Sequence, residues 1–177
     1  ADRLAPTGIL RRPQSSRRWR TSSIAGGRSI DSITTEHRSN EERLRWLLDA
    51  RPPCVFIPTY EEDYALELVR KAIPLGHPAA MWTATQGVCG SLFEVTDAVA
   101  DTEHLAAALY HFAYRLDEPT VAVALDVVDH LDDAYTRRAM REGIARFREM
   151  RSSLILVDHN DRLPDVIAAD ATTFELT

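Results

Sequence analysis

The sequence predicts an α/β fold in which a three-layer arrangement places a mostly parallel, five-stranded sheet between helices. Two observations carry this prediction. Short apolar runs alternate with amphipathic helical segments from residue 39 onward, and the run at residues 120–125 is apolar without any polar alternation. Both patterns are typical of parallel strands that are buried on both faces. Successive strand–helix–strand units of this kind form a right-handed, doubly wound sheet.

The first elements have clear boundary signals. An apolar stripe of leucines predicts a helix over residues 40–51, and two prolines end it. A strand over residues 54–57 follows. Thr59, with Glu62 three residues later, forms a capping-box pattern. We therefore expect the second helix to begin there and to continue to about Ile73.

The remaining elements continue the alternation. A strand at residues 79–83 is followed by a long irregular stretch, and a third helix is expected from near Asp101 because apolar residues recur there at helical spacing. The third strand covers residues 120–125. Asp132 can cap a fourth helix. Its inner face consists of large apolar residues: Met140, Ile144, Phe147 and Met150. Two further strands are expected, at residues 153–157 and 172–176.

The chain of 177 residues has the length of one domain with an additional segment. Residues 1–38 are rich in Arg, Ser, Gly and Pro and show no helical or strand period, so we expect a disordered tail before one folded domain at residues 39–177. An organelle transit peptide is the alternative interpretation of such a segment. Residues 1–30 contain seven arginines and one aspartate, so the rest of the chain carries a net charge of −12.

Charge and cysteine content exclude several functions. An acidic body is a poor partner for phosphate backbones, so we expect no nucleic-acid binding. Cys54 and Cys89 lack CxxC spacing, which predicts reduced thiols and neither a disulfide framework nor a zinc knuckle. No apolar run approaches the roughly 18–20 residues that span a bilayer, so we expect no membrane partner and a cytoplasmic location.

The turn after the first strand, residues 58–63, lacks the features of a phosphate-binding loop. Such a loop needs glycines, free backbone N–H groups and a lysine, whereas this turn supplies three consecutive carboxylates. These carboxylates suit a helix N-terminus but would repel the phosphates of a nucleotide. We therefore predict a P-loop NTPase-like topology without a phosphate-binding loop, and neither a catalytic residue nor a cofactor for this chain. Thr59 and Asp126 are the weak candidates for contact with a nucleotide.

Acidic residues and histidines follow the third and fourth strands: Asp126, Asp129, His130, Asp158, His159 and Asp161. Adjacent parallel strands would bring the two groups together, and a mixed oxygen and nitrogen ligand set could bind a metal ion that activates water. A metal-dependent hydrolase is therefore one alternative function. The simpler interpretation is that these side chains cap turns and are solvated. Val127 stands after Asp126 where an active ATPase usually has a glutamate, so the likeness to a Walker B strand is architectural.

Three short segments together resemble a known family. They read FIPTYEE at residues 56–62, MWTATQG at residues 81–87 and VVDHL at residues 127–131. Their order is similar to that in the N-terminal, ATPase-like domain of the AAA ATPases first described as a hypothetical chloroplast reading frame and also found in cyanobacteria. The resemblance extends from about residue 41 to residue 177.

This resemblance implies a non-catalytic regulatory or interaction domain that packs against an AAA module in its own, longer chain. ATP hydrolysis, with ATP and Mg²⁺ as cofactors, would belong to that module, and the full-length protein would form a homo-oligomer. The resemblance specifies no further protein partner. A third hypothesis is a nucleotide-sensing domain that binds ATP without hydrolysing it.

Overall fold

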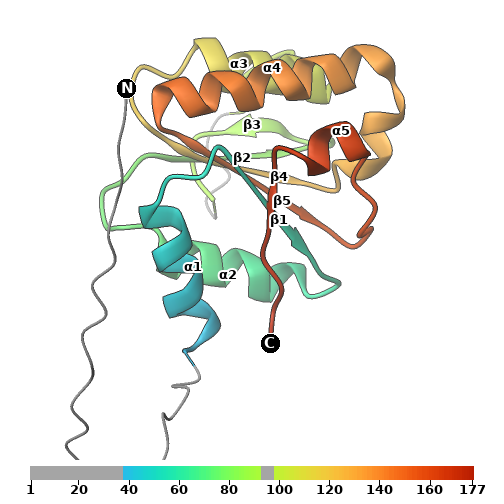
Figure 1. Cartoon of the computed structure of the whole chain (residues 1–177). Coiled ribbons are helices and arrows are strands. Elements are labelled where there is room, and N and C mark those ends of the chain that lie inside the picture. Colours follow the sequence, from blue (N-terminus) through green and yellow to red (C-terminus); the bar gives the residue numbers. More distant parts are fainter. Residues whose placement is uncertain (1–37, 93–97) are drawn as a thin grey trace, which may run out of the picture. The chain divides into compact units, whose positions relative to one another are not determined.

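A six-stranded sheet forms the middle layer of the fold (Figure 1), in the order β3-β2-β4-β5-β1-β6. We describe a computed structural model of residues 38–92 and 98–177. The strands are β1 (Cys54–Pro58), β2 (Ala79–Thr83), β3 (Gly87–Cys89), β4 (Val121–Leu125), β5 (Ser153–Asp158) and β6 (Thr172–Thr173). All neighbouring pairs are parallel except β2 with β3. The arrangement is consistent with the P-loop-like topology expected from the sequence.

Helices cover both faces of the sheet. Helices α1 (Asn40–Asp49) and α2 (Glu62–Ala72) lie on one face, and α3 (Leu105–Tyr114) and α4 (Ala134–Met150) lie on the other (Figure 1). Two short helices complete the described part: the 3₁₀ helix η1 (Val128–Asp132) and α5 (Asp165–Ala168). None of the helices in the described ranges is long and apolar enough to cross a membrane.

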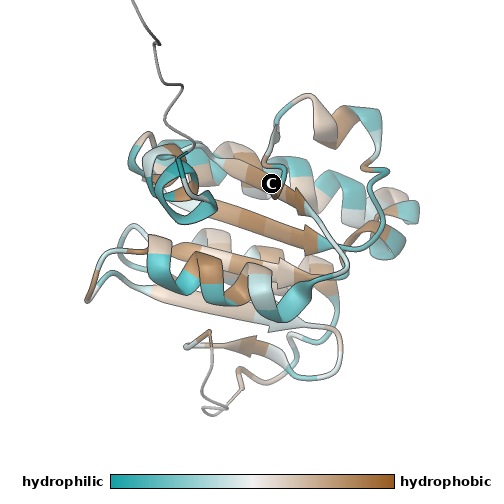
Figure 2. Ribbon diagram, turned by 90° about the horizontal axis from the view of Figure 1, so that it is seen from below, coloured by the Kyte–Doolittle hydropathy of each residue, from teal (hydrophilic) through white to brown (hydrophobic). Residues whose placement is uncertain are grey.

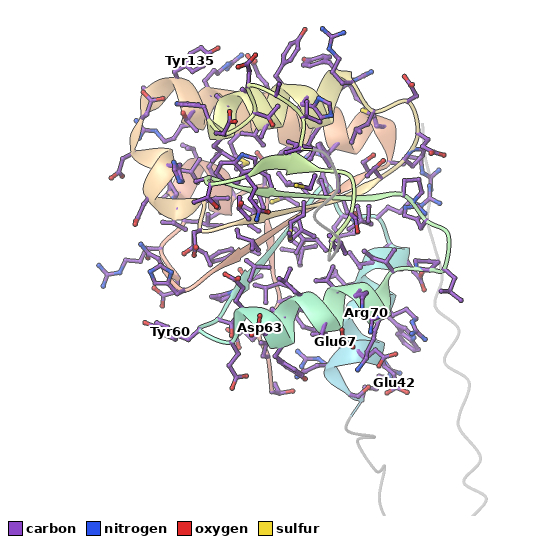
Figure 3. The ribbon with its side chains drawn as sticks, turned by 180° about the vertical axis from the view of Figure 1, so that it is seen from behind. Glu42, Tyr60, Asp63, Glu67, Arg70 and Tyr135 are labelled. Atoms are coloured by element: carbon purple, nitrogen blue, oxygen red, sulfur yellow. The ribbon has the colours of Figure 1, made fainter. Side chains whose placement is uncertain are left out.

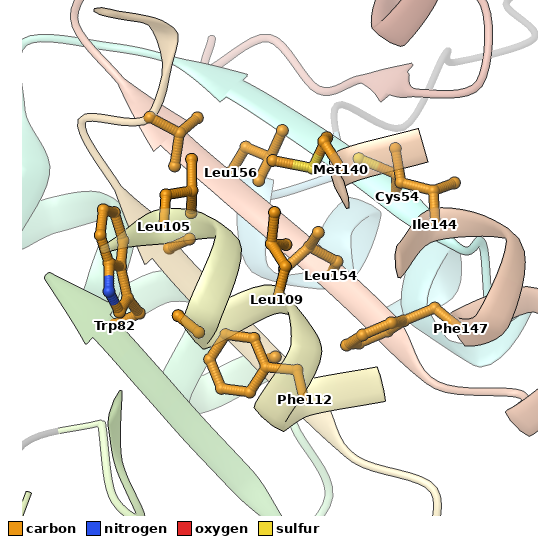
Figure 4. Close-up of a cluster of buried hydrophobic side chains, with 14 of the residues drawn as sticks. Cys54, Trp82, Leu105, Leu109, Phe112, Met140, Ile144, Phe147, Leu154 and Leu156 are labelled. Atoms are coloured by element: carbon orange, nitrogen blue, oxygen red, sulfur yellow. The ribbon is translucent and has the colours of Figure 1, made fainter. Parts of the chain in front are cut away.

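The side chains of the central strands alternate between two apolar cores. Cys54 and Phe56 of β1 face α3 and α4, whereas Val55 and Ile57 face α1 and α2. The central strands are therefore mostly apolar, while the polar residues concentrate on the helices and loops (Figure 2). The core beneath α3 and α4 contains the large buried ring of Trp82 (Figure 4). Burial on both faces explains why these strands show no alternating polarity.

Local sequence signals set the ends of the helices. The Ser39 hydroxyl accepts a hydrogen bond from the Glu42 N–H, and the Glu42 carboxylate accepts one from the Ser39 N–H, so a capping box begins α1. At α4 the capping residue is Asp133, whose carboxylate accepts a hydrogen bond from the Thr136 N–H at 2.7 Å. The prediction of Asp132 was wrong by one residue, because Asp132 is the last residue of η1.

The predicted count of five strands was wrong. The additional strand β3 lies within the stretch expected to be irregular and forms a hairpin with β2. Gly87 has φ of +73°, a conformation that glycine adopts without strain, and it allows the chain to reverse there. At the other edge, β6 pairs with β1 at Thr172 and Thr173 alone, so it is shorter than predicted. The predicted tail lies outside the described residues, except for residue 38.

Candidate functional site

The carboxyl ends of three neighbouring strands converge at one edge of the sheet. Leu125 of β4 is in register with Val157 of β5, and Pro58 of β1 is in register with Asp158. The residues that follow these strands therefore lie beside one another. This is the edge at which open α/β sheets bind ligands.

Asp158 is the buried anchor of this edge. Its side chain is only 2% exposed. One carboxylate oxygen accepts a hydrogen bond from the Val128 N–H at 2.8 Å, and the other accepts one from the Asn160 N–H at 2.8 Å. Its own carbonyl oxygen accepts a hydrogen bond from the Thr59 N–H at 2.8 Å. Asp158 thus ties together the segments that follow β4, β5 and β1.

Asp126 and His159 lie close to Asp158. The Nδ1 atom of His159 is 3.3 Å from Oδ1 of Asp126 and 3.5 Å from Oδ1 of Asp158. Asp126 has φ of +51°, in the left-handed region that aspartate and asparagine tolerate better than most residues. One ligand atom from each of the three residues lies within 4.8 Å of the others. The set offers two carboxylates and one imidazole, donor types that suit a divalent metal ion.

The structure brings together three of the six residues considered as metal ligands. Among the residues described, Asp129, His130 and Asp161 do not join this group. The ring of His130 packs edge-on against Trp82, with the ring centroids 5.5 Å apart. For Asp129 and His130 the cause is η1, because the chain turns into a helix at Val128 and carries these two side chains away from the strand ends. Asp161 lies in the loop between β5 and α5.

The turn from β1 into α2 differs from the sequence prediction. The Thr59 hydroxyl accepts a hydrogen bond from the Glu61 N–H at 3.0 Å, only two residues later. The residue at the N-cap position is Glu61, and its side chain makes no capping hydrogen bond. The predicted capping box of Thr59 and Glu62 was therefore wrong, and the helix begins at Glu62. The hydroxyl stabilises the tight turn in place of the helix end.

The start of α2 places negative charge at the same edge. Partial burial, together with the nearby charges of Asp126 and Asp63, raises the pKa of Glu62. The Tyr60 ring, which is 87% exposed, lies with its centroid 6.1 Å from that of His159. Figure 3 shows Tyr60 and Asp63 together at the beginning of α2. Sequence reasoning did not place Tyr60 and Glu62 beside His159 and Asp126. Their proximity follows from the strand order, which puts β1 next to β5 and is decided by the tertiary structure.

A second notable surface lies over α3 and α4. Three tyrosines there are largely exposed: Tyr110, Tyr114 and Tyr135. The rings of Tyr110 and Tyr114 are 5.0 Å apart, and the Arg146 guanidinium lies 5.8 Å from the centre of the Tyr114 ring. Small side chains line the groove between the two helices, with Gly143 among them. Tyr135 of this tyrosine-lined groove lies far from Tyr60 and Asp63 at the start of α2 (Figure 3).

Comparison with models of protein families matches residues 40–176 to one described as "SpoVK-like AAA ATPase, N-terminal domain". The match includes every strand and helix of the described structure. No curated protein and no solved structure matches the chain.

Proposed function

The chain belongs to the family of SpoVK-like AAA ATPase N-terminal domains, and from this premise we propose that it is a non-catalytic regulatory or interaction domain of an AAA ATPase. ATP hydrolysis would then take place in a separate AAA module, with Mg²⁺ as its cofactor. In this proposal the domain binds other parts of the protein or its partners and catalyses no reaction.

One observation carries the proposal: backbone N–H groups of the turn between β1 and α2 form hydrogen bonds within the domain. Two of its N–H groups are already used, that of Thr59 by the Asp158 carbonyl and that of Glu61 by the Thr59 hydroxyl. A phosphate-binding loop instead directs several free N–H groups at the ligand. The residues that follow, Glu62 and Asp63, add negative charge at the helix start. An ATP triphosphate would meet like charge here.

The tyrosine-lined groove supports the interaction part of the proposal. Tyr110 is 56%, Tyr114 54% and Tyr135 74% exposed. Tyrosine and arginine are enriched in the buried centres of protein interfaces, because each combines a large apolar surface with a polar group. We propose that this groove contacts the AAA module of the protein to which the domain belongs.

Two measurements test the proposal. The first titrates the full chain with MgATP and follows its melting temperature and phosphate release. A ligand present at about 100 times its Kd stabilises a fold by about 2.7 kcal/mol, roughly a 5–10 °C rise for a domain of this size. We expect no such rise and no turnover. A clear rise without turnover would favour the nucleotide-sensing alternative, and turnover would reject the non-catalytic role.

The second measurement tests the surface. The full chain is mixed with an AAA module from a SpoVK-like ATPase, and binding is followed by calorimetry. We expect Tyr110→Ala and Tyr135→Ala to weaken binding roughly tenfold or more, as for interface centres. Tyr60→Ala is the matched control, because Tyr60 is also an exposed tyrosine but lies at the other site. Equal effects of all three substitutions would reject the groove as the interface.

Three finer statements belong to the same proposal. We propose that the chain represents the chloroplast and cyanobacterial type within its family, which is supported by the segments at residues 56–62, 81–87 and 127–131. We propose that the complete protein acts in the cytoplasm. We also propose that it forms a homo-oligomer through its AAA module.

A further inference from the structure

We infer that Asp126, Asp158 and His159 form a binding site for a single divalent transition-metal ion of the zinc type. This inference is independent of the role proposed above, because it concerns ion binding by this chain and assigns no reaction to the ion. The three residues come from the ends of β4 and β5, which lie next to each other in the sheet.

Nδ1 of His159 and Oδ1 of Asp126 lie at hydrogen-bond distance, and the spacing of the ligand atoms also suits a metal ion. Tetrahedral zinc binds nitrogen and oxygen at about 2.0–2.2 Å, which sets the distance between two ligand atoms at about 3.4 Å. Nδ1 of His159 lies 3.3 Å and 3.5 Å from the two aspartate oxygens. A charge-assisted hydrogen bond would bring these atoms to about 2.7–2.9 Å. The third distance, between Asp126 and Asp158, is within 4.8 Å and closes by a small movement of the exposed Asp126.

The surroundings of Asp158 are those of an oriented ligand. Each carboxylate oxygen accepts one backbone N–H, from Val128 or from Asn160, and each retains a further lone pair. Hydrogen bonds of this kind hold a metal ligand in position, and their loss usually lowers metal affinity. The buried carboxylate is therefore already immobilised before an ion arrives.

The two other ligands leave the site accessible. The side chains of His159 and Asp126 are 54% and 62% exposed, so an ion can enter from solvent and keep at least one water molecule. Two carboxylates and a neutral imidazole carry a net charge of −2, which a divalent ion neutralises. Three protein ligands with an open fourth position is a common coordination of accessible zinc sites.

The test is a zinc titration of the full chain, freed of metal and in competition with a chromophoric zinc chelator. We expect one zinc ion per chain. Asp126→Asn and His159→Ala should each lower the affinity roughly tenfold or more. Both substitutions change side chains that are more than half exposed, so the fold is retained, and circular dichroism verifies this.

Two matched controls change the same residue types outside the site. Asp129→Asn alters a carboxylate of η1, and His77→Ala alters an imidazole in the loop before β2. We expect both variants to bind zinc as the unaltered chain does. The inference is wrong if the unaltered chain binds no zinc. It is also wrong if binding survives in both site variants, or if the controls weaken it as much.

Discussion

The buried carboxylate of Asp158 should stabilise the fold, and replacing it with asparagine tests this directly. The carboxylate accepts two backbone N–H groups, from Val128 and Asn160, at 2.8 Å each. Asparagine keeps the shape but has only one acceptor oxygen, so one N–H would face the amide NH₂ group. A hydrogen bond to a charged acceptor contributes about 1.5–3 kcal/mol, and we expect Asp158→Asn to lower the free energy of unfolding by that amount.

Urea denaturation followed by tryptophan fluorescence, to which the buried Trp82 contributes, measures this loss. For a slope of about 1–3 kcal/mol per M urea, the midpoint should fall by roughly 1 M. A metal chelator in every sample keeps ion binding out of the measurement. Asp126→Asn is the matched control, since it makes the same change at the end of the next strand. Its side chain is 62% exposed, and asparagine accepts its left-handed backbone.

We expect Asp126→Asn to change the free energy of unfolding by less than about 0.5 kcal/mol, as is usual for exposed positions. The result that refutes the reasoning is a similar stability of the two variants. Asp158 would then make hydrogen bonds that add nothing to the stability of the strand edge.

Three further predictions concern the rest of the fold. Gly87→Ala should lower the free energy of unfolding by at least about 1–2 kcal/mol, because Gly87 has positive φ and an added Cβ atom would lie 2.6 Å from the Thr102 hydroxyl. Gly90→Ala should leave this free energy unchanged, since an added Cβ atom there would have no atom within 4 Å; equal urea midpoints of the two variants would contradict this. Burial raises the pKa of Cys54 to about 12, so its thiol should resist alkylation at pH 8 in the native state and react after unfolding. Rapid labelling of Cys54 in the native chain would show that the buried position is wrong. Burial and neighbouring carboxylates raise the pKa of Glu62, so its ionisation opposes folding as the pH rises above the unfolded pKa of 4.5. Glu62→Gln should therefore increase the melting temperature at pH 7 but not at pH 3. An equal gain at both pH values would argue against the electrostatic cause.

Much of the site could be anticipated from the chain because strand ends are visible in the sequence. Asp126 and Asp158 each follow an apolar run directly, His159 comes next after Asp158, and parallel strands end at the same edge of a sheet. Asp129 and His130 were also expected there, but η1 turns them away from the strand ends. A short 3₁₀ helix has no apolar periodicity, so the sequence contains little that indicates it.

The sequence by itself determined the α/β class, the positions of the major helices and strands, and the acidic start of α2. These properties depend on side-chain periods and capping residues a few positions apart, which act locally. Only the tertiary structure decided that β1 lies beside β5, that β3 adds a sixth strand, and that the Thr59 hydroxyl serves a turn instead of a helix end. Each of these outcomes depends on contacts between distant segments or on competition between donors for one acceptor. Such contacts form only when the helices pack on the sheet.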